Sequence, residues 1–514
     1  MKKHIIGLLL LVASSLLVIP SFNLFWSDRA STFDWTDPAA LYNVDFGRRL
    51  LSDVLVPLGI SVDPSNVIVG RNGWFFLGDA YARGVSEQRR IPDEADRERG
   101  MEISRTAREW QYALCQAGIK AYKIIVGPNK SEIYAEKAPS WMKAPSPSVA
   151  DTFMGELGPQ YVDVRQALAD AAKQSHVPLY YPTDSHWNRL GAGVAFRTFA
   201  EQTARDLPDI RWPSPESYLA SGRQARSAGD LAAFLNLQRD YSEWEELPSP
   251  PIRALRITQI DWRSGKPLLS GPNQPVPRWS TPILVRSPDA LNQRRVLWLR
   301  DSFGTNMSPY MSQTFSDILQ LHWSEGMKPE VLKELVDGFK PDYVFVTVVE
   351  RDARNEAFSK PLILPGVNGH AKETDKPIAA TLHSVHDVVV SDQNSGFAIS
   401  GPDPSLVFDL PNGTAGSDKT HVKIDLNCQS QSQPVQLQMF WATNMAAGFN
   451  EARSIRLTYD PSKPLYPLHL LDSGLAGERL TKLRVDVDSP AVCSKFDLAP
   501  PVLVAVSPHS EVCN

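Results

Sequence analysis

The chain has 514 residues, which is enough for two to four domains and a large buried core. Hydrophobic residues make up 42% and charged residues 22%, the composition of an ordinary globular protein. The formal net charge of −5 argues against a general nucleic-acid-binding protein, whose surface would be basic, so we expect no nucleic acid as a partner. A polysaccharide partner is compatible with this charge, because a local cationic groove can lie on an acidic protein.

The N-terminus predicts a membrane anchor. Lys2 and Lys3 precede an apolar stretch from Ile5 to Phe22, and about 18 helical residues span roughly 27 Å, close to the hydrocarbon core of a bilayer. We therefore expect residues 1–26 to be an uncleaved signal anchor, single-pass in the inner membrane, with the bulk of the chain in the periplasm. A cleaved signal peptide is the alternative, and the absence of a good A-x-A-like cleavage site at the end of the stretch argues against it.

Cysteine usage bears on metal binding and on compartment. The four cysteines form no C-x-x-C motif and no Cys/His cluster, so we expect no metal site and no cofactor. Cys428, Cys493 and Cys513 lie close to the C-terminus, which fits one disulfide in an oxidising compartment. The pairing cannot be read from the sequence.

The segment from about residue 97 to residue 349 alternates helical and extended patterns. This alternation predicts an α/β fold with a mostly parallel sheet covered on both faces. An Asn-Gly hairpin at 67–77 precedes it, and the proline-rich stretch 207–290 is interpreted as an insertion or lid. The predicted helices are 97–117, 165–174 and 190–206, and the predicted strands are 121–126, 161–164, 178–181, 295–299 and 343–349.

After about residue 378, helical periodicity gives way to short alternating segments, typical of an antiparallel β-sandwich or jelly roll. We therefore predict a catalytic domain at 27–377 and a carbohydrate-binding-module-like domain at 378–514. Aromatic residues such as Trp441 are expected to hold a polymer there by stacking on its sugar rings. The alternative is that this domain only packs against the sheet edge and that Trp441 belongs to its core.

Reactive residue types follow the predicted strands. In open α/β sheets, sites form outside the carboxyl ends of the strands. Strand 121–126 is followed by Asn129 and Lys130, strand 178–181 by Asp184 and His186, strand 295–299 by Arg300 and Ser302, and strand 343–349 by Arg351. Since the strands are almost purely apolar, this sorting predicts one site at the sheet edge.

Ser302, His186 and Asp184 fit nucleophilic acyl transfer. A serine hydroxyl becomes a good nucleophile when a base removes its proton, and a carboxylate keeps that base in the correct tautomer. Ser302 lies at a strand-to-helix junction, where backbone N–H groups can stabilise an oxyanion. Taken singly, Ser302 also reads as a helix N-cap, and the Asp184–His186 segment as a turn.

Two motifs resemble the split motifs of the SGNH-hydrolase-like domain in the AlgX/AlgJ alginate O-acetylation family. They are Thr183-Asp184-Ser185-His186-Trp187-Asn188 and Arg300-Asp301-Ser302-Phe303. The order is permuted, because Asp-x-His precedes the serine here, whereas common SGNH esterases place the serine first. Similar stretches are Gly73–Leu77, Pro128–Lys130 and Gly229-Asp230-Leu231, so the likeness covers roughly residues 65–355.

The resemblance implies O-acetylation of an exported polysaccharide, with a membrane-bound O-acyltransferase supplying the acetyl group. Ser302 would be the nucleophile, His186 the general base and Asp184 the orienting carboxylate. Asn129 and the Ser302 amide are candidates for the oxyanion hole, with Lys130, Arg300 and Arg351 as further oxyanion or substrate-binding residues. Arg300 replaces the glycine of the common G-D-S motif.

Two alternative functions remain at this stage. The first is a carbohydrate acetylesterase that uses the same triad with water as the acceptor. The second is a non-catalytic, glycan-binding assembly factor with a vestigial triad.

Overall fold

The computed structural model describes residues 45–360, except 248, 278 and 279, together with much of the C-terminal region. The other described residues are 5–6, 14, 16–21, 23, 38–43, 362, 377–390, 396–411, 421–428, 435–459, 465–467, 479–488 and 491–504. The predicted anchor, residues 1–26, therefore lies largely outside the described residues. Within the part of the chain that is described, no helix is long and apolar enough to cross a bilayer.

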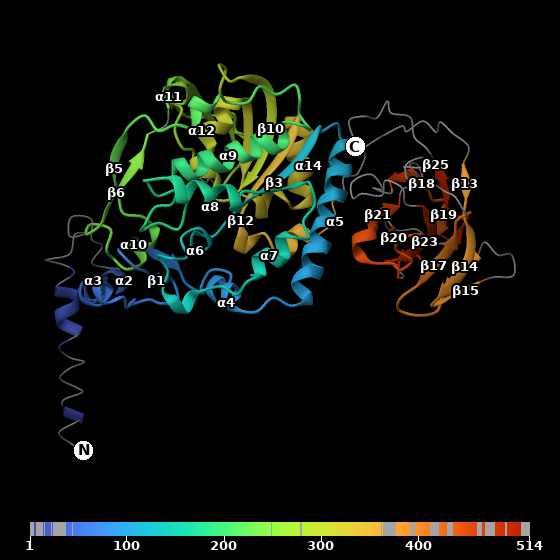
Figure 1. The fold of residues 1–514 in the computed structure, drawn as a ribbon, viewed down its shortest axis with the longest axis horizontal. Helices are drawn as coiled ribbons and strands as arrows, with labels where there is room; N and C mark the ends of the chain where they lie inside the picture. The colour runs from blue at the N-terminus through green and yellow to red at the C-terminus, as the bar shows by residue number, and fades with distance from the viewer. Residues whose placement is uncertain are drawn as a thin grey trace.

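An eight-stranded mixed sheet forms the centre of the α/β unit (Figure 1). Neighbouring strands β4, β3, β12, β10 and β11 run parallel, and the antiparallel strands β9, β7 and β8 extend one edge. Every residue of β3 and β12 is buried, because central strands are covered on both faces. In sheet order, the strands are β4 (Tyr161–Asp163), β3 (Ala121–Gly127), β12 (Tyr343–Val349), β10 (Asn292–Arg300), β11 (Phe315–Leu321), β9 (Ile283–Arg286), β7 (Arg256–Asp261) and β8 (Pro267–Pro272).

Helices cover both faces of this sheet, and each face has its own apolar core. Successive residues of a strand enter opposite cores, so Ile125 and Trp298 lie on one side and Ile124 and Leu299 on the other. One face is covered by α5 (Glu94–Gln116), α7 (Val149–Met154) and α14 (Pro329–Phe339), and the other by α8 (Arg165–Gln174), α9 (Arg189–Thr203) and α12 (Gly304–Thr314).

Smaller elements surround this sandwich. The Asn-Gly hairpin is present, with β1 and β2 pairing antiparallel across a turn in which Asn72 and Gly73 both have positive φ. The elements are α2 (Pro38–Leu41), α3 (Asp45–Leu55), β1 (Val67–Val69), β2 (Phe75–Leu77), α4 (Gly84–Arg89), α6 (Lys130–Ile133), β5 (Arg223–Ser227), α10 (Asp230–Phe234), β6 (Ser242–Glu246), α11 (Pro250–Ala254) and α13 (Trp323–Gly326).

Two expectations for this unit are corrected. Residues 178–181 form no sheet strand, since Tyr180 makes only an isolated bridge to Trp187 and the chain turns back on itself there. The stretch 207–290 is not an irregular lid, because it contributes β7, β8 and β9 to the central sheet and a separate β5–β6 hairpin. These antiparallel strands make the sheet mixed, and β4, β3, β12, β10 and β11 form its predicted parallel part.

The C-terminal unit consists of antiparallel strands around one apolar core, which confirms the predicted β-sandwich type of fold. Residues 363–376 lie outside the described residues, so the domain boundary at 377/378 stays a prediction. The strands are β13 (Ile378–Ala379), β14 (Thr381–His386), β15 (Val388–Val390), β16 (Gly396–Ile399), β17 (Ser405–Asp409), β18 (His421–Lys423), β19 (Leu426–Cys428), β20 (Val435–Thr443), β21 (Ser454–Tyr459), β22 (Leu465–Pro467), β23 (Leu480–Val487), β24 (Lys495–Leu498) and β25 (Val502–Val504).

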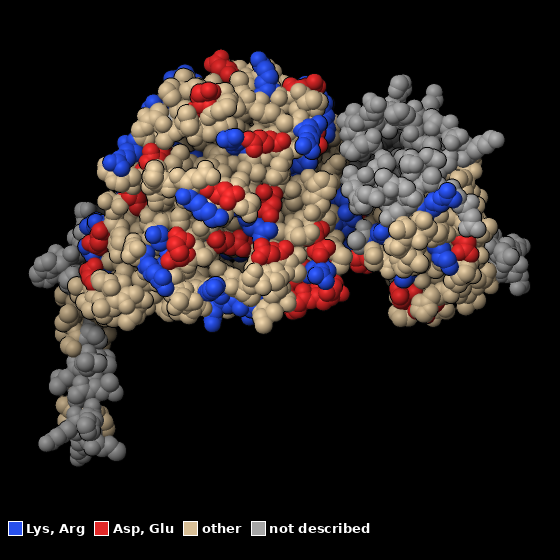
Figure 2. All heavy atoms as spheres, in the orientation of Figure 1, with Lys and Arg blue, Asp and Glu red and all other residues tan. Residues whose placement is uncertain are grey.

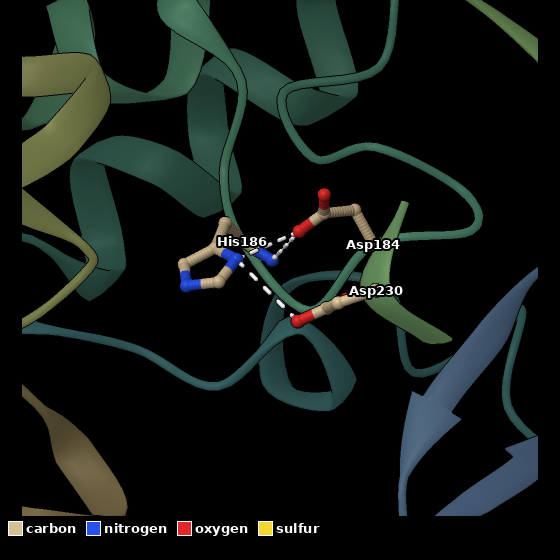
Figure 3. Close-up of side chains that lie close together, drawn as sticks. All are labelled: Asp184, His186 and Asp230. Carbon is tan, nitrogen blue, oxygen red and sulfur yellow. Dashed lines mark hydrogen bonds and ion pairs between the residues drawn. The ribbon is translucent and has the colours of Figure 1, made fainter. Parts of the chain in front are cut away.

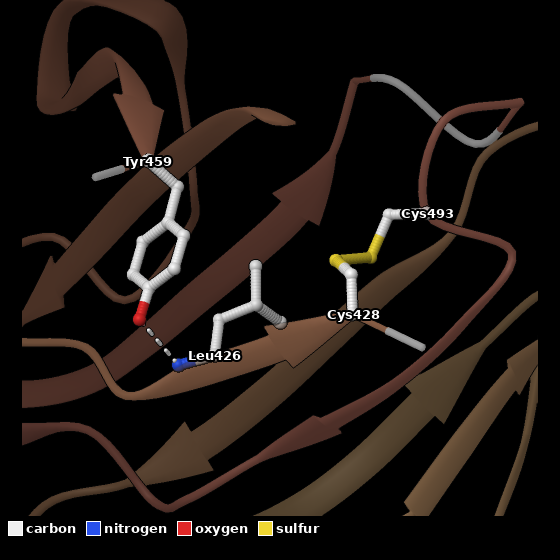
Figure 4. The surroundings of a disulfide bond; sticks show 4 residues. All are labelled: Leu426, Cys428, Tyr459 and Cys493. Atoms are coloured by element: carbon white, nitrogen blue, oxygen red, sulfur yellow. Dashed lines mark hydrogen bonds between the residues drawn. A yellow bond between two sulfur atoms is a disulfide. The ribbon is translucent and has the colours of Figure 1, made fainter. Parts of the chain in front are cut away.

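A disulfide joins Cys428, at the end of β19, to Cys493, just before β24 (Figure 4). The Tyr459 hydroxyl nearby accepts a hydrogen bond from the Leu426 amide at 2.9 Å, which links β21 to the start of β19. Cys115 is disulfide-bonded as well. The expectation of a single disulfide was therefore too low.

Candidate active site

The structure brings Asp184, His186 and Ser302 into one hydrogen-bonded chain. His186 Nδ1 lies 2.7 Å from Asp184 Oδ1, and His186 Nε2 lies 2.7 Å from Ser302 Oγ. The His186 amide also donates to Asp184 Oδ1 at 3.1 Å, so this carboxylate holds both the ring and the backbone of the histidine. This is the arrangement that allows an imidazole to take the proton of a serine hydroxyl.

Asp301 fixes the turn that presents Ser302 between β10 and α12. Its carboxylate accepts from the Phe303 amide at 2.9 Å and from the Val349 amide at 2.7 Å, which ties this turn to the end of β12. Asp301 is fully buried, and burial raises the pKa of its carboxyl group above the ordinary value. The Asp301 carboxylate therefore fixes the turn on which Ser302 lies.

Three contacts join the histidine segment to the serine segment. The Trp187 indole nitrogen donates to the Phe303 carbonyl at 2.8 Å, and the Asn306 side chain donates to the Trp187 carbonyl at 2.8 Å. The His186 and Phe303 rings pack with their centroids 5.3 Å apart. Asn188 caps α9 by accepting from the Leu190 and Gly191 amides, which ends the turn. The histidine–serine distance is thus set by packed and hydrogen-bonded neighbours.

Residues from the stretch 207–290 complete the surroundings of Asp184. Arg226 of β5 donates to Asp184 Oδ2 at 3.2 Å. Glu243 of β6 accepts from the amide and the hydroxyl of Thr183, at 2.6 and 2.8 Å. Gly229 lies against Asp184 so closely that a Cβ at this position would be 2.2 Å from Asp184 Cβ, and only glycine fits.

Asp230 is a second carboxylate beside His186 (Figure 3). Its Oδ2 atom lies 3.8 Å from His186 Nδ1, and its two oxygens accept from the amide and the hydroxyl of Ser185 at 2.8 and 2.6 Å. Asp184, His186 and Asp230 are close enough together to hold a metal ion. The carboxylate oxygens nevertheless already accept from N–H and O–H groups and from Arg226, which fits a hydrogen-bonded triad better than a metal site.

The pKa values of the Asp–His pair follow from its geometry. Burial disfavours the charged forms of both groups, but the mutual hydrogen bond and charge attraction outweigh it. The pKa of Asp184 is lowered, with a further contribution from Arg226, and the pKa of His186 is raised above its ordinary value. Asp184 is therefore ionised at neutral pH and favours the imidazolium that forms during proton transfer.

Lys130 lies beneath the site rather than in it. Its ammonium donates to the carbonyls of Tyr181, Pro182 and Asp184 at 3.1, 3.0 and 2.7 Å, which uses all three of its donors. The ammonium also lies over the Trp74 and Phe76 rings, and burial lowers its pKa to about 8. Lys130 therefore holds the backbone that carries the triad and has no donor left for an oxyanion.

Arg300 and Trp441 are also buried inside the protein. Arg300 is buried and donates to the Gln320 side chain and to the carbonyls of Val276 and Pro277, so it ties the serine turn to its surroundings. Trp441 lies in the core of the C-terminal unit with only 3% of its surface exposed. This placement corresponds to the alternative considered for Trp441, and it leaves no indole face for a sugar ring.

Asn129 and Arg351 lie at the ends of β3 and β12 and contact each other. The Arg351 guanidinium donates to Asn129 Oδ1 at 3.1 Å, and the Asn129 backbone N–H donates to the Glu350 carboxylate at 3.2 Å. Since Oδ1 faces Arg351, the Asn129 side-chain NH₂ is left for another acceptor.

Some of these residues were not assigned a role from the sequence. Arg226 binds Asp184, which is 42 residues away in the chain, and Glu243 binds Thr183, which is 60 residues away. Both belong to the stretch 207–290, which the sequence predicts to be irregular. The Gly229-Asp230 pair belongs to the motifs that carry the family resemblance, and this is the one sequence signal for it. The close approach of Gly229 to Asp184 explains the glycine.

Comparisons with known proteins identify a family that the chain resembles. Residues 67–276 match the family described as "SGNH hydrolase-like domain, acetyltransferase AlgX". The match confirms the resemblance and supports an acyltransferase at family level. It includes Asp184 and His186 and ends before Ser302. No curated protein matches the chain.

Solved structures that resemble the chain do so at low identity. PatB1 of Bacillus cereus with a sulfonyl adduct has a TM-score of 0.41 at 14% identity, covering 57% of this chain and 97% of its own. The O-acetyltransferase domain of Pseudomonas putida AlgJ has a TM-score of 0.34 at 17% identity, covering 56% and 92%. Pseudomonas aeruginosa AlgX has a TM-score of 0.32 at 12% identity, covering 86% and 94%.

Proposed function

We propose that the protein is a periplasmic O-acetyltransferase that moves acetyl groups onto hydroxyls of an exported polysaccharide through an acetyl–Ser302 intermediate. The observation that carries the proposal is the Asp184–His186–Ser302 chain, with 2.7 Å at each of its two side-chain links. The family match to an acetyltransferase supports transfer over hydrolysis.

The reaction needs two acyl transfers at the same serine. In the first, His186 Nε2 takes the Ser302 proton while Oγ attacks the acetyl carbonyl carbon of the donor. The bond between acetyl carbon and donor oxygen then breaks, and the departing oxygen receives the proton from His186. In the second, a sugar hydroxyl gives its proton to His186 and attacks the acetyl carbon, and Ser302 Oγ leaves and recovers that proton.

The tetrahedral intermediates of both steps carry a negative oxygen that needs hydrogen-bond donors. We assign the Ser302 backbone amide and the Asn129 side-chain NH₂ to this role. Removal of one such donor typically costs about 10²–10³ in kcat. Arg351 acts on Asn129 by fixing the direction of its amide group.

The location of the protein belongs to the same proposal. The disulfides at Cys428–Cys493 and at Cys115 support an oxidising compartment such as the periplasm. The apolar stretch Ile5–Phe22 supports an inner-membrane anchor, which would keep the site near a membrane-bound acetyl donor. Fractionation of cells and sequencing of the mature N-terminus would test the anchor, and a mature protein beginning near residue 24 would overturn it.

The decisive experiment compares transfer with hydrolysis. The full chain in detergent is incubated with an activated acetyl ester, with and without deacetylated polysaccharide, and acetyl incorporation and free acetate are measured. We expect incorporation that is lost in Ser302→Ala. Acetate release with no incorporation would instead identify an acetylesterase, and neither product would indicate a binding protein with an inactive triad.

A further inference from the structure

A pocket lies beside the proposed oxyanion residue Asn129, and we call it the side pocket. It is bordered by the segment before α4, by α4 itself, by the start of α7 and by the end of β12. Its lining residues are Ala82, Gly84, Glu87, Gln88, Asn129, Glu132, Ser148, Val149, Ala150, Phe153, Glu350, Arg351 and Arg354.

Asn129, which we assign to the oxyanion, is itself one of the residues that line the side pocket. Arg351 lines the pocket and donates to Asn129 at 3.1 Å. Its charge also acts on His186, where it opposes the imidazolium form and slightly offsets the upward shift of the His186 pKa. A molecule in the pocket would thus lie against the group that we assign to the oxyanion.

Two carboxyl groups in the pocket form an acid–carboxylate pair. Burial raises the pKa of Glu132 well above its usual range, and the neighbouring carboxylate of Glu350 raises it further. Glu132 is therefore protonated while Glu350 accepts from the Asn129 amide. A side-chain hydrogen bond between the two carboxyl groups contributes to this rise in pKa, so the acid O–H of Glu132 is directed at Glu350. The remaining lone pairs of the two carboxyl groups can accept from hydroxyl groups of a ligand.

The charges of the lining favour an uncharged ligand. Arg354 is paired with Glu87 and with the buried Asp96, so it offers little net charge to the pocket. Arg351 and Glu350 contribute one charge of each sign to the lining, and Glu132 is neutral. The lining therefore has no excess of positive charge to attract an anionic sugar, whereas hydroxyl groups would find carboxyl oxygens and amide groups.

The segment at the mouth of the pocket is held in an uncommon backbone conformation. Ala82 and the next residue, Arg83, both adopt left-handed φ, at 51° and 53°. Such conformations cost energy in non-glycine residues, and they gather at ligand-binding and catalytic sites. Figure 2 shows charges of both signs mixed over the face that it displays, which gives that face no broad attraction for a polyanion.

We propose that the side pocket binds an uncharged, hydroxyl-rich sugar unit of the acceptor polysaccharide and so presents its hydroxyl to acetyl–Ser302. This inference rests on the proposed function and adds the class of acceptor. Glu132, Glu350 and Gln88 would hydrogen-bond the sugar hydroxyls, and the aliphatic surface of Ala150 would lie along the ring. Holding the acceptor in this way favours transfer over attack by water.

A pocket-filling variant provides the test. Gly84 lines the pocket and a Cβ on it would have no heavy atom within 4 Å, so Gly84→Trp adds a bulky side chain at the pocket. Gly47 in α3 is equally open and lies outside the pocket lining, so Gly47→Trp is the matched control. The measurement is the ratio of acetyl transferred to a neutral oligosaccharide to acetate released.

We expect Gly84→Trp to lower this ratio roughly tenfold or more, because the acceptor loses its positioning, and Gly47→Trp to leave it unchanged. An unchanged ratio in Gly84→Trp would overturn the inference while leaving the proposed function intact. Wild-type protein that releases acetate and transfers none would overturn the proposed function instead. A uronic-acid oligosaccharide preferred over the neutral one would refute the sugar class.

If Gly84→Trp does not fold, a second pair of variants decides. Glu132→Gln keeps a neutral donor and acceptor in the pocket, and Glu132→Ala removes both. We expect the transfer ratio to fall in Glu132→Ala and to recover largely in Glu132→Gln. Equal ratios in the two variants would overturn the inference.

Discussion

At the scale of single residues, the site differs from a simple triad by its second carboxylate. Asp230 lies 3.8 Å from His186 Nδ1 and reaches the same nitrogen through Ser185, whose hydroxyl is 3.2 Å from Nδ1. Asp184 lies closer, with its Oδ1 atom 2.7 Å from His186 Nδ1, and its Oδ2 atom accepts a hydrogen bond from Arg226. Two carboxylates can thus stabilise the same imidazolium, directly or through one hydroxyl.

We therefore expect Asp184→Asn to retain more activity than loss of a triad carboxylate usually leaves. Such a loss costs roughly 10⁴ in kcat where no second carboxylate is present. Here we expect a loss of about 10² for Asp184→Asn, a smaller loss for Asp230→Asn, and about 10⁴ for the double variant. Hydrolysis of a small acetyl ester measures all three. A double variant no worse than Asp184→Asn would show that Asp230 takes no part.

The pH profile tests the same pair. His186 acts as a base only when neutral, and Asp184 raises its pKa against the effect of burial. The acid limb of kcat/KM should therefore have its midpoint above the ordinary histidine value of about 6.5. In Asp184→Asn the midpoint should move to lower pH, because the charge that favours the imidazolium is gone. A midpoint that does not move would mean that another group controls this limb.

At the scale of elements, the segment Tyr181–Asp184 is held from three sides. Lys130 of α6 binds its carbonyls, Glu243 of β6 binds Thr183, and Gly229 before α10 packs directly against Asp184. The position of the triad carboxylate thus depends on residues outside the triad.

Gly229→Ala measures that dependence. The added Cβ would lie 2.2 Å from Asp184 Cβ, so Asp184 or the Gly229 backbone must move, and we expect this movement to disturb the Asp184–His186 hydrogen bond. We expect kcat for ester hydrolysis to fall about 10²-fold, since a displacement of 1 Å in a catalytic group has costs of this order. Gly271→Ala in β8, where a Cβ would meet open space, is the control. Full activity in Gly229→Ala would mean that the segment adjusts without moving Asp184.

The sequence predicts part of this arrangement and not the rest. The strands β3, β10 and β12 each contain an apolar run, and a parallel sheet brings their carboxyl ends together, so Ser302, Asn129 and Arg351 could be located. Arg226 and Glu243 could not, because their partners are 42 and 60 residues away and no local pattern encodes such pairs. The burial of Trp441 follows from period-two alternation, because Leu437, Met439 and Trp441 lie on the same face of one strand and all three are in the core.

At the scale of the whole molecule, α5 joins the two units. Arg105 and Glu109 of α5 are almost fully buried, with 1% and 6% of their side chains exposed, against β21 and the residues before it. Arg105 contacts Glu451 and Ser454, and Glu109 accepts from the Arg456 amide at 2.5 Å. Burial raises the pKa of Glu109 to about 7, although Arg105 opposes the shift.

This buried pair should make the two substitutions at the interface strongly non-additive. Removing Arg105 alone leaves the Glu109 carboxyl group buried without its cation, and removing Glu109 alone leaves the buried guanidinium with the Glu451 carboxylate but without that of Glu109. Loss of one member of a buried pair costs about 3–5 kcal/mol, whereas replacement of both by apolar residues of similar volume is often neutral or better. We therefore expect Arg105→Met and Glu109→Leu each to lower the Tm of the full chain clearly, and the double variant to recover most of the loss.

Because the raised pKa of Glu109 means that folding favours its protonated form, its contribution to stability is fully present below about pH 4.5 and is lost as the pH rises through 7. Glu109→Leu should remove this dependence. Calorimetry of the four proteins at pH 5 and pH 8 measures both effects, and a double variant whose loss equals the sum of the single losses would show that the two groups act independently at this interface.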